Sequence, residues 1–150
     1  MKIKYVHTNI IAKDWKKVSQ FYQHVFGCKP VPPERNLSGE WLDKLTGIEN
    51  AHVTGEHLIL PGYEEFHPTL EIFSYNNSDS NNPKAINGVG LSHLAFEVDD
   101  VALILQKILE EGGGQVGELI KTKYPNNVTA TFVYAKDIEG NIIELQSWEK

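Results

Sequence analysis

Residues 7–14 read HTNIIAKD and residues 93–100 read HLAFEVDD, and the two stretches share an internal pattern. In each stretch a histidine opens a run of strand-forming residues, and an aspartate stands seven positions later. After each aspartate the apolar residues take on the spacing of an amphipathic helix. The repetition predicts two copies of one structural module, each beginning with a strand and a helix.

The two helices have recognisable ends. Asp14 and Asp100 are suitable N-caps, because an aspartate side chain accepts hydrogen bonds from the free N–H groups of a first helical turn. Glycine follows both helices, at Gly27 and at residues 112–114. We therefore expect helices over 14–26 and about 100–111. Their apolar stripes comprise Trp15, Val18, Phe21, Tyr22, Val25 and Phe26 in the first, and Val101, Ile104, Leu105, Ile108 and Leu109 in the second.

Strand-forming segments follow each helix. After the first we expect a short strand over 28–31, a loop with Pro32 and Pro33, a short helix over 40–45, and strands over 50–60 and 69–75. After the second we expect strands over 115–120, 129–136 and 141–148. Residues 76–89 are rich in Asn and Ser and contain Pro and Gly, a composition typical of linkers.

The order of these segments predicts the fold class. Module 1 covers about 1–75, the linker covers 76–89, and module 2 covers about 90–150, together forming a single domain over 1–150. Each module reads as βαβββ. We expect an α+β protein in which the two paired modules form one curved mixed sheet with helices on its convex face.

Composition narrows the function classes. The 150 residues are 41% hydrophobic and 23% charged, as in ordinary globular proteins. A net charge of −6 argues against a nucleic-acid-binding surface. A single cysteine excludes an internal disulfide and favours a reducing compartment. The sequence shows no signal peptide and no apolar run of membrane-spanning length, so we expect a cytoplasmic protein that binds neither membranes nor nucleic acids.

Two glutamates occupy unusual positions. Glu71 and Glu144 lie in the middle of expected strands between aliphatic neighbours, although glutamate is depleted in strands. A carboxylate in such a place must be paired or must bind a metal. Each module also offers a histidine on its first strand, His7 and His93. If the modules pack as pseudo-symmetric partners, two imidazoles and two carboxylates converge, a set that suits Zn, Ni, Co, Mn or Fe(II).

The segments HTNIIAKD, PTLEIFSYN, GLSHLAFEVDD and DIEGNIIEL resemble the vicinal oxygen chelate superfamily. That superfamily includes glyoxalase I, methylmalonyl-CoA epimerase, extradiol dioxygenases and the bleomycin- and fosfomycin-resistance proteins. The resemblance implies paired modules around a metal cleft. It also implies that His7, Glu71, His93 and Glu144 are the metal ligands. A carboxylate at position 71 is closest to glyoxalase I, whereas the epimerase usually has glutamine there.

The resemblance implies an activity. We expect a metal-dependent isomerase or lyase of the glyoxalase I type, acting on a small 2-oxoaldehyde–thiol adduct or a related α-hydroxycarbonyl compound through an enediolate. The expected cofactor is a divalent ion, Ni, Zn, Co or Mn. A glutamate beside the metal moves a proton between neighbouring carbons, with Glu144 as the expected base and Glu71 as the second choice.

Two alternatives stay open. An acyl-CoA epimerase of the methylmalonyl-CoA epimerase type would use the same route, and a resistance protein would sequester a drug or metabolite without catalysis. Glyoxalase I holds glutathione through cationic side chains, one of which often stands where this chain has Ile11. The only arginine, Arg35, falls in an expected loop. The sequence therefore does not identify the thiol of the adduct as glutathione.

Other candidate residues have simpler interpretations. His24, His52 and His57 are expected on the surface, and His67 in a loop, because Pro68 follows it. Trp41, Leu42 and Leu45 form either a lid or an ordinary amphipathic turn. Cys28 is expected to be buried as a small hydrophobe. We expect a homodimer that binds a small-molecule substrate, with a site either within one chain or across the dimer.

Overall fold

The computed structural model describes residues 2–63, 68–78, 84–124 and 127–149. The chain divides into two compact units, Met1–Asn81 and Asn82–Lys150, and each is considered by itself. His67 and part of the expected linker lie outside the described residues. In the part of the chain that the structure describes, no helix is long and apolar enough to cross a membrane.

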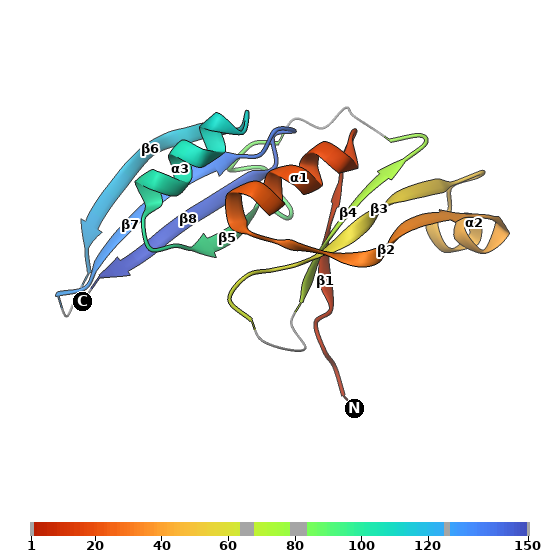
Figure 1. The fold of residues 1–150 in the computed structure, drawn as a ribbon, viewed down its shortest axis with the longest axis horizontal. Coiled ribbons are helices and arrows are strands. Elements are labelled where there is room, and N and C mark those ends of the chain that lie inside the picture. Colours follow the sequence, from red (N-terminus) through yellow and green to blue (C-terminus); the bar gives the residue numbers. More distant parts are fainter. Residues whose placement is uncertain (1, 64–67, 79–83, 125–126, 150) are drawn as a thin grey trace. The chain divides into compact units, whose positions relative to one another are not determined.

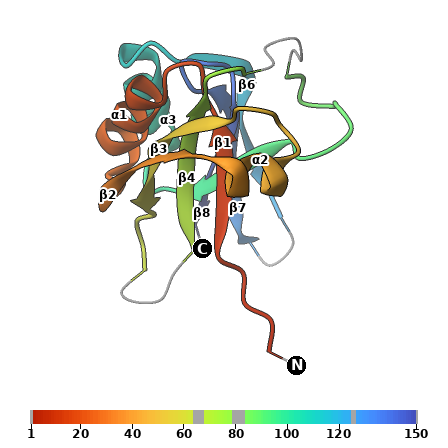
Figure 2. The same cartoon turned by 90° about the vertical axis from the view of Figure 1, so that its right-hand side faces the viewer.

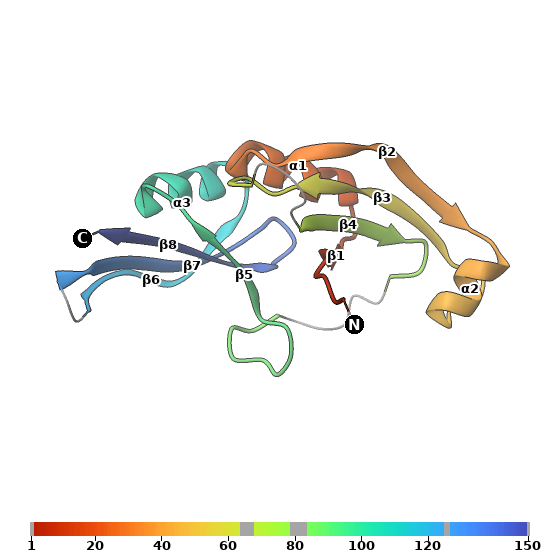
Figure 3. The ribbon, with the colours of Figure 1, turned by 90° about the horizontal axis from the view of Figure 1, so that it is seen from below.

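Unit 1 contains a four-stranded mixed sheet in the order β1-β4-β3-β2, which is easiest to follow in Figure 3. Strands β1 and β4 are parallel, and the other neighbours are antiparallel. Figure 2 shows the residues before β1 leading away from this sheet as an extended tail. The elements in chain order are β1 (His7–Ile11), α1 (Trp15–Phe26), β2 (Lys29–Ser38), α2 (Glu40–Thr46), β3 (His52–Ile59) and β4 (Thr69–Tyr75).

Helix α1 begins and ends where its sequence indicates. The side chain of Asp14 accepts a hydrogen bond from the N–H of Lys17 at 3.2 Å. Gly27 takes the left-handed conformation (φ 68°) that ends many helices. All six residues of the expected apolar stripe are buried. The buried Ser19 hydroxyl also donates a hydrogen bond to the buried carboxylate of Glu56, which attaches α1 to β3.

Strand β2 differs from the expectation. It runs through Pro32 and Pro33, where a loop was expected, and includes Arg35, which pairs with Gly55 of β3. The prolines are tolerated because β2 is an edge strand and its register with β3 shifts between Val31 and Arg35. Arg35 therefore belongs to the sheet, and the loop assignment was wrong.

Unit 2 repeats the architecture without a counterpart of α2 among its described residues. Its sheet has the order β5-β8-β7-β6, and α3 lies across β6, β7 and β8 (Figure 1). The side chain of Asp100 caps α3 by accepting a hydrogen bond from the N–H of Leu103 at 2.9 Å. The elements are β5 (His93–Glu97), α3 (Val101–Glu110), β6 (Gly114–Lys123), β7 (Thr129–Lys136) and β8 (Ile142–Glu149).

The two sheets repeat at the level of single residues. In unit 1, the residue two positions after His7 pairs with Glu71, and in unit 2 the residue two positions after His93 pairs with Glu144. Both pairings join parallel strands. The expected α+β class with two βαβββ units is confirmed. The described strands form a mixed four-stranded sheet in each unit, where one sheet shared by both modules was expected.

Candidate metal centre

Strand alternation places Glu71 on the sheet face opposite the core of unit 1. Its neighbours Leu70 and Ile72 are 1% and 0% exposed and lie on the face that α1 covers. Glu71 points the other way, with its side chain 12% exposed. Glu144 repeats this arrangement in unit 2, where Ile143 and Leu145 are both fully buried.

Three side chains converge on the Glu71 carboxylate. His7 Nε2 lies 3.3 Å from Oε2, and His57 Nε2 lies 2.9 Å from Oε1. The Asn9 amide also donates a hydrogen bond to Oε2 at 2.8 Å. The structure thus brings together the expected pair His7 and Glu71, and adds two residues, Asn9 and His57, that sequence reasoning had not placed at the site.

The expectation that His57 lies on the surface was wrong. His57 pairs with Glu71 across the β3–β4 ladder, so both side chains stand on the same face. Its side chain is only 19% exposed. Strand periodicity does put His57 on one face of β3. Which residue of β4 it pairs with depends on the register between the two strands, which periodicity does not give. Asn9 had a clearer signal, because it shares strand parity with His7.

The surroundings of His57 influence its ring. Its Nδ1 lies 3.1 Å from the Thr69 hydroxyl, and its ring meets that of Phe73 edge-on at 6.0 Å between centroids. Burial lowers the pKa of His57, the Glu71 carboxylate opposes this, and the positive charges of Arg35 and His7 reinforce it. The only arginine of the chain therefore acts electrostatically on this site.

Unit 2 contains the second expected pair. His93 Nε2 lies 2.9 Å from Glu144 Oε2, with side chains that are 29% and 18% exposed. The His93 ring also contacts that of Tyr134, with 5.2 Å between centroids. Tyr134 pairs with Glu144 across the β7–β8 ladder, so it occupies in unit 2 the position that His57 occupies in unit 1.

Aromatic rings extend the same face of unit 2. Gln146 and Trp148 follow Glu144 at alternate positions of β8, and Phe132 pairs with Gln146. The Phe132 and Trp148 rings lie 5.3 Å apart, and Tyr124 lies 5.4 Å from Trp148. We call Tyr124, Phe132, Tyr134 and Trp148 the aromatic row.

The donor groups fit a divalent metal ion. Among the described residues, His7, His57 and Glu71 each offer one ligand atom, and these atoms all lie within 4.8 Å of one another. Imidazole nitrogen and carboxylate oxygen together suit transition metals such as Zn, Ni and Co. His93 and Glu144 offer the same two donor types in unit 2. That both pairs serve one ion remains a prediction.

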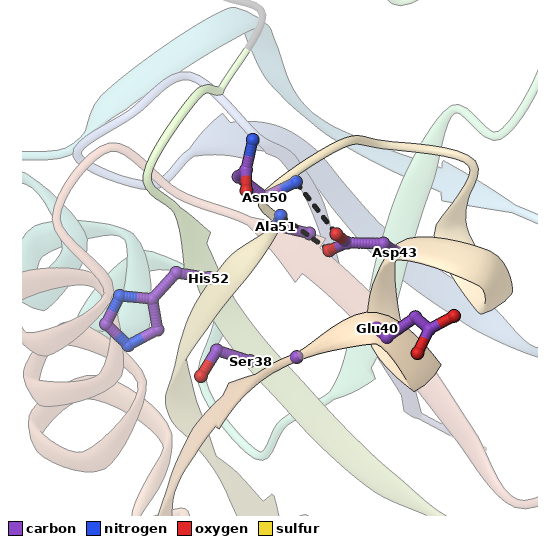
Figure 4. A pocket seen from close by; sticks show the side chains of 7 residues that line it. Ser38, Glu40, Asp43, Asn50, Ala51 and His52 are labelled. Atoms are coloured by element: carbon purple, nitrogen blue, oxygen red, sulfur yellow. Dashed lines mark hydrogen bonds between the residues drawn. The ribbon is translucent and has the colours of Figure 1, made fainter.

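A pocket elsewhere in unit 1 has a structural origin. It is lined by residues of β2, α2 and the start of β3, including Ser38, Glu40 and His52. Figure 4 shows the Asp43 carboxylate facing the following loop, where it accepts hydrogen bonds from the N–H groups of Asn50 and Ala51 at 2.9 and 2.8 Å. The His52 ring points away from this carboxylate. Asp43 thus holds the loop between α2 and β3.

Similar solved structures share this fold. A glyoxalase family protein from Bacillus cereus matches with a TM-score of 0.77 and 19% identity, covering 100% of this chain and 95% of that one. The fosfomycin resistance protein FosX from Listeria monocytogenes, complexed with Mn(II) and sulfate ion, matches with a TM-score of 0.57 and 14% identity over 97% and 91% of the chains.

A glyoxalase I mutant from Zea mays matches with a TM-score of 0.66 and 20% identity. That match covers 95% of this chain but 44% of the maize chain. Comparison with curated proteins found no match. The family model for the Glyoxalase/Bleomycin resistance protein/Dioxygenase superfamily matches residues 4–145. With that match across nearly the whole sequence and the repeated His–Glu pairs on its two sheets, the chain belongs to this superfamily.

Proposed function

We propose that the protein is a metal-dependent isomerase or lyase of the glyoxalase I type, acting on a small 2-oxoaldehyde–thiol adduct or a related α-hydroxycarbonyl compound. The observation that carries the proposal is the repeated register of the two units. In each, a histidine of the first strand faces a glutamate of the last, at 3.3 Å for His7 and Glu71 and 2.9 Å for His93 and Glu144.

These four residues would hold the ion, with Ni, Zn, Co and Mn as the expected metals. A bound divalent ion would act as a Lewis acid that polarises a substrate carbonyl. A carbon next to that carbonyl then loses its proton more easily. The protein must supply a base that removes the proton and returns it to the neighbouring carbon, a net isomerisation that needs no external oxidant or reductant.

Glu144 is the better candidate for this base. Glu71 is in contact with His7, His57 and Asn9, so its orientation is fixed by several partners. Among the contacts of the described residues, Glu144 forms one ion pair, with His93. A carboxylate with fewer partners has more freedom to reach a substrate carbon, which favours Glu144 for proton transfer and Glu71 for holding the ion.

Two features suggest the kind of substrate. The aromatic row extends from the His93–Glu144 pair along the same sheet face, and an apolar or aromatic substituent would pack against it. Arg35 pairs with Gly55 on the face that carries His57, and its charge acts on that histidine. One arginine can bind a single carboxylate, whereas coenzyme A and glutathione carry several anionic groups. We therefore favour a compact substrate with at most one anionic group.

The decisive variant is Glu144→Gln. The expected result is a fall in kcat of about 10²–10⁴-fold, because this is the usual contribution of a general base, while bound metal is largely retained. The protein is purified without chelator, its metal content is measured, and turnover is screened with 2-oxoaldehyde–thiol adducts and acyl-CoA thioesters. Glu118→Gln, an exposed residue of β6, is the matched control and should leave kcat unchanged.

Three results would contradict the proposed base or the proposed function. Turnover that survives in Glu144→Gln would show that the base is misassigned. Turnover of acyl-CoA thioesters alone would select the epimerase alternative. A protein that binds no metal after supplementation, and turns over none of these compounds, would instead be a sequestering protein.

A further inference from the structure

The face of the unit 1 sheet carries one imidazole more than its counterpart in unit 2. His57 and Tyr134 occupy equivalent positions, since each pairs with the glutamate of its sheet. In unit 1 that position supplies an imidazole nitrogen 2.9 Å from the carboxylate, and in unit 2 it supplies a phenol ring against His93. The two units therefore differ in the number of nitrogen and oxygen donors that they offer to a metal ion.

The spacing of the unit 1 ligands matches that of a metal site. Two ligand atoms each about 2.1 Å from an ion, at right angles to one another, are about 3.0 Å apart. The two histidine nitrogens lie 3.3 and 2.9 Å from the oxygens of Glu71, and the three ligand atoms fall within 4.8 Å of one another. An ion can thus contact all three residues with only small side-chain movements.

Neighbouring side chains hold two of these ligands in place. The Thr69 hydroxyl lies 3.1 Å from His57 Nδ1, which leaves Nε2 directed at the carboxylate. The Asn9 amide holds Glu71 Oε2 at 2.8 Å. Metal-binding histidines and carboxylates in proteins are commonly oriented by hydrogen bonds of this kind, which fix the ring and the carboxylate before the ion arrives.

We propose that His7, His57 and Glu71 form a complete three-ligand site for a divalent transition metal within unit 1, with His57 as a direct ligand. The inference concerns the metal centre on which the proposed function rests, and it adds a ligand from β3 to the expected set. Two histidines and one carboxylate leave further coordination positions open on a six-coordinate ion. Unit 1 is then the part of the chain that captures the ion.

The test removes the unit 2 ligands from the full-length protein. The double variant His93→Ala/Glu144→Gln should still bind stoichiometric Co(II), detected by the visible absorption of the protein-bound ion and by equilibrium titration. Adding His57→Phe, which keeps a ring but removes both nitrogens, should abolish that absorption. Adding His52→Phe, on the same strand but exposed, should leave it unchanged.

The size of the effect separates a ligand from an orienting residue. Loss of a side chain that only orients a ligand weakens metal binding about 10–100-fold, so loss of His57 as a ligand should weaken it by more. His57→Gln serves as a second variant, and circular dichroism confirms that each variant is folded. A loss within that range, or unchanged Co(II) binding, would overturn the assignment of His57 as a ligand.

Failure of this inference is distinguishable from failure of the proposed function. Absence of Co(II) binding in the double variant would overturn the unit 1 site even if the wild-type enzyme turns over its substrate. Stoichiometric Co(II) binding that depends on His57 would support the site even if no compound tested is a substrate.

Discussion

At the scale of the residue, partners decide what two similar glutamates do. Glu71 and Glu144 have the same register and similar neighbours along their strands, yet their contacts across the sheet differ. An amide and two imidazoles surround Glu71, and one imidazole faces Glu144. Chemical role follows from these cross-strand neighbours, which is why we assign metal capture to one glutamate and proton transfer to the other.

The buried thiol of Cys28 should make the free energy of unfolding depend on pH. Its side chain is 4% exposed, and burial raises the pKa of the thiol from 9.0 to about 11. The unfolded chain therefore releases this proton at a lower pH than the folded chain does. The stabilising contribution is fully present below pH 9 and is lost as the pH rises toward about 11. The loss should be on the order of 2 kcal/mol.

Urea unfolding of wild type and Cys28→Ala, below pH 9 and near pH 11, measures this contribution. The two proteins share all their other titratable groups, so the difference between their losses of free energy of unfolding isolates the thiol. Wild type should lose more of its free energy of unfolding than the variant. Equal losses would mean that the folded thiol is not protected from ionisation.

At the scale of the element, β3 carries His57 to the Glu71 carboxylate. Val53 lies in a small buried cluster with Leu42 and Ala51, which anchors one end of the strand. Gly55 makes room for the Phe73 ring, and His57 contacts both that ring and Glu71. The strand thus connects the packing of α2 with the geometry of the proposed metal ligands.

Gly55→Ala should disrupt this strand. A Cβ atom at position 55 would lie 2.1 Å from the Ile72 carbonyl oxygen and 2.4 Å from Cδ1 of Phe73. Because the carbonyl belongs to the sheet backbone, it cannot move aside easily. Overpacking of this kind costs about 1–3 kcal/mol, so the free energy of unfolding should fall by at least that much. Chemical denaturation measures it.

The same substitution should weaken metal binding, since displacement of Phe73 disturbs the ring of His57. Gly114→Ala is the control, because no atom lies within 4 Å of the Cβ position there. Wild-type stability in Gly55→Ala would show that β3 and β4 can separate without cost, and that Gly55 has no role in fixing the site.

At the scale of the whole molecule, the ion should stabilise the folded chain. A ligand that binds only the folded state, at about 100 times its Kd, adds about 2.7 kcal/mol to the free energy of unfolding. For a chain of this size that corresponds to a rise in Tm of roughly 5–10 °C. Differential scanning calorimetry with and without Co(II), followed by EDTA, checks both the rise and its reversal.

Glu71→Gln should remove most of this rise, because the variant loses the carboxylate shared by both histidines. The exposed Glu118→Gln should keep it. If both variants respond equally to Co(II), the ion binds somewhere other than at the Glu71 cluster. The expected homodimer stays a prediction at this scale.

The sequence by itself determined the local elements and the repeat. Aspartate caps, glycine ends and apolar stripes located α1 and α3, because these signals act within a few turns of helix. Strand alternation put Glu71 and Glu144 on the faces away from the core. The repeat assigned one histidine and one glutamate to each module, and the structure shows that the two face each other across parallel strands.

Only the tertiary structure decided which residues of the other strands lie beside these histidines and glutamates. The partner of Glu71 on β3 depends on the register between β3 and β4, and a shift of one residue would turn His57 to the opposite face. Arg35 belongs to β2 although the prolines before it predicted a loop, because an edge strand tolerates proline. Both outcomes depend on pairing between distant segments, whose free energy comes from long-range packing that local sequence patterns do not contain.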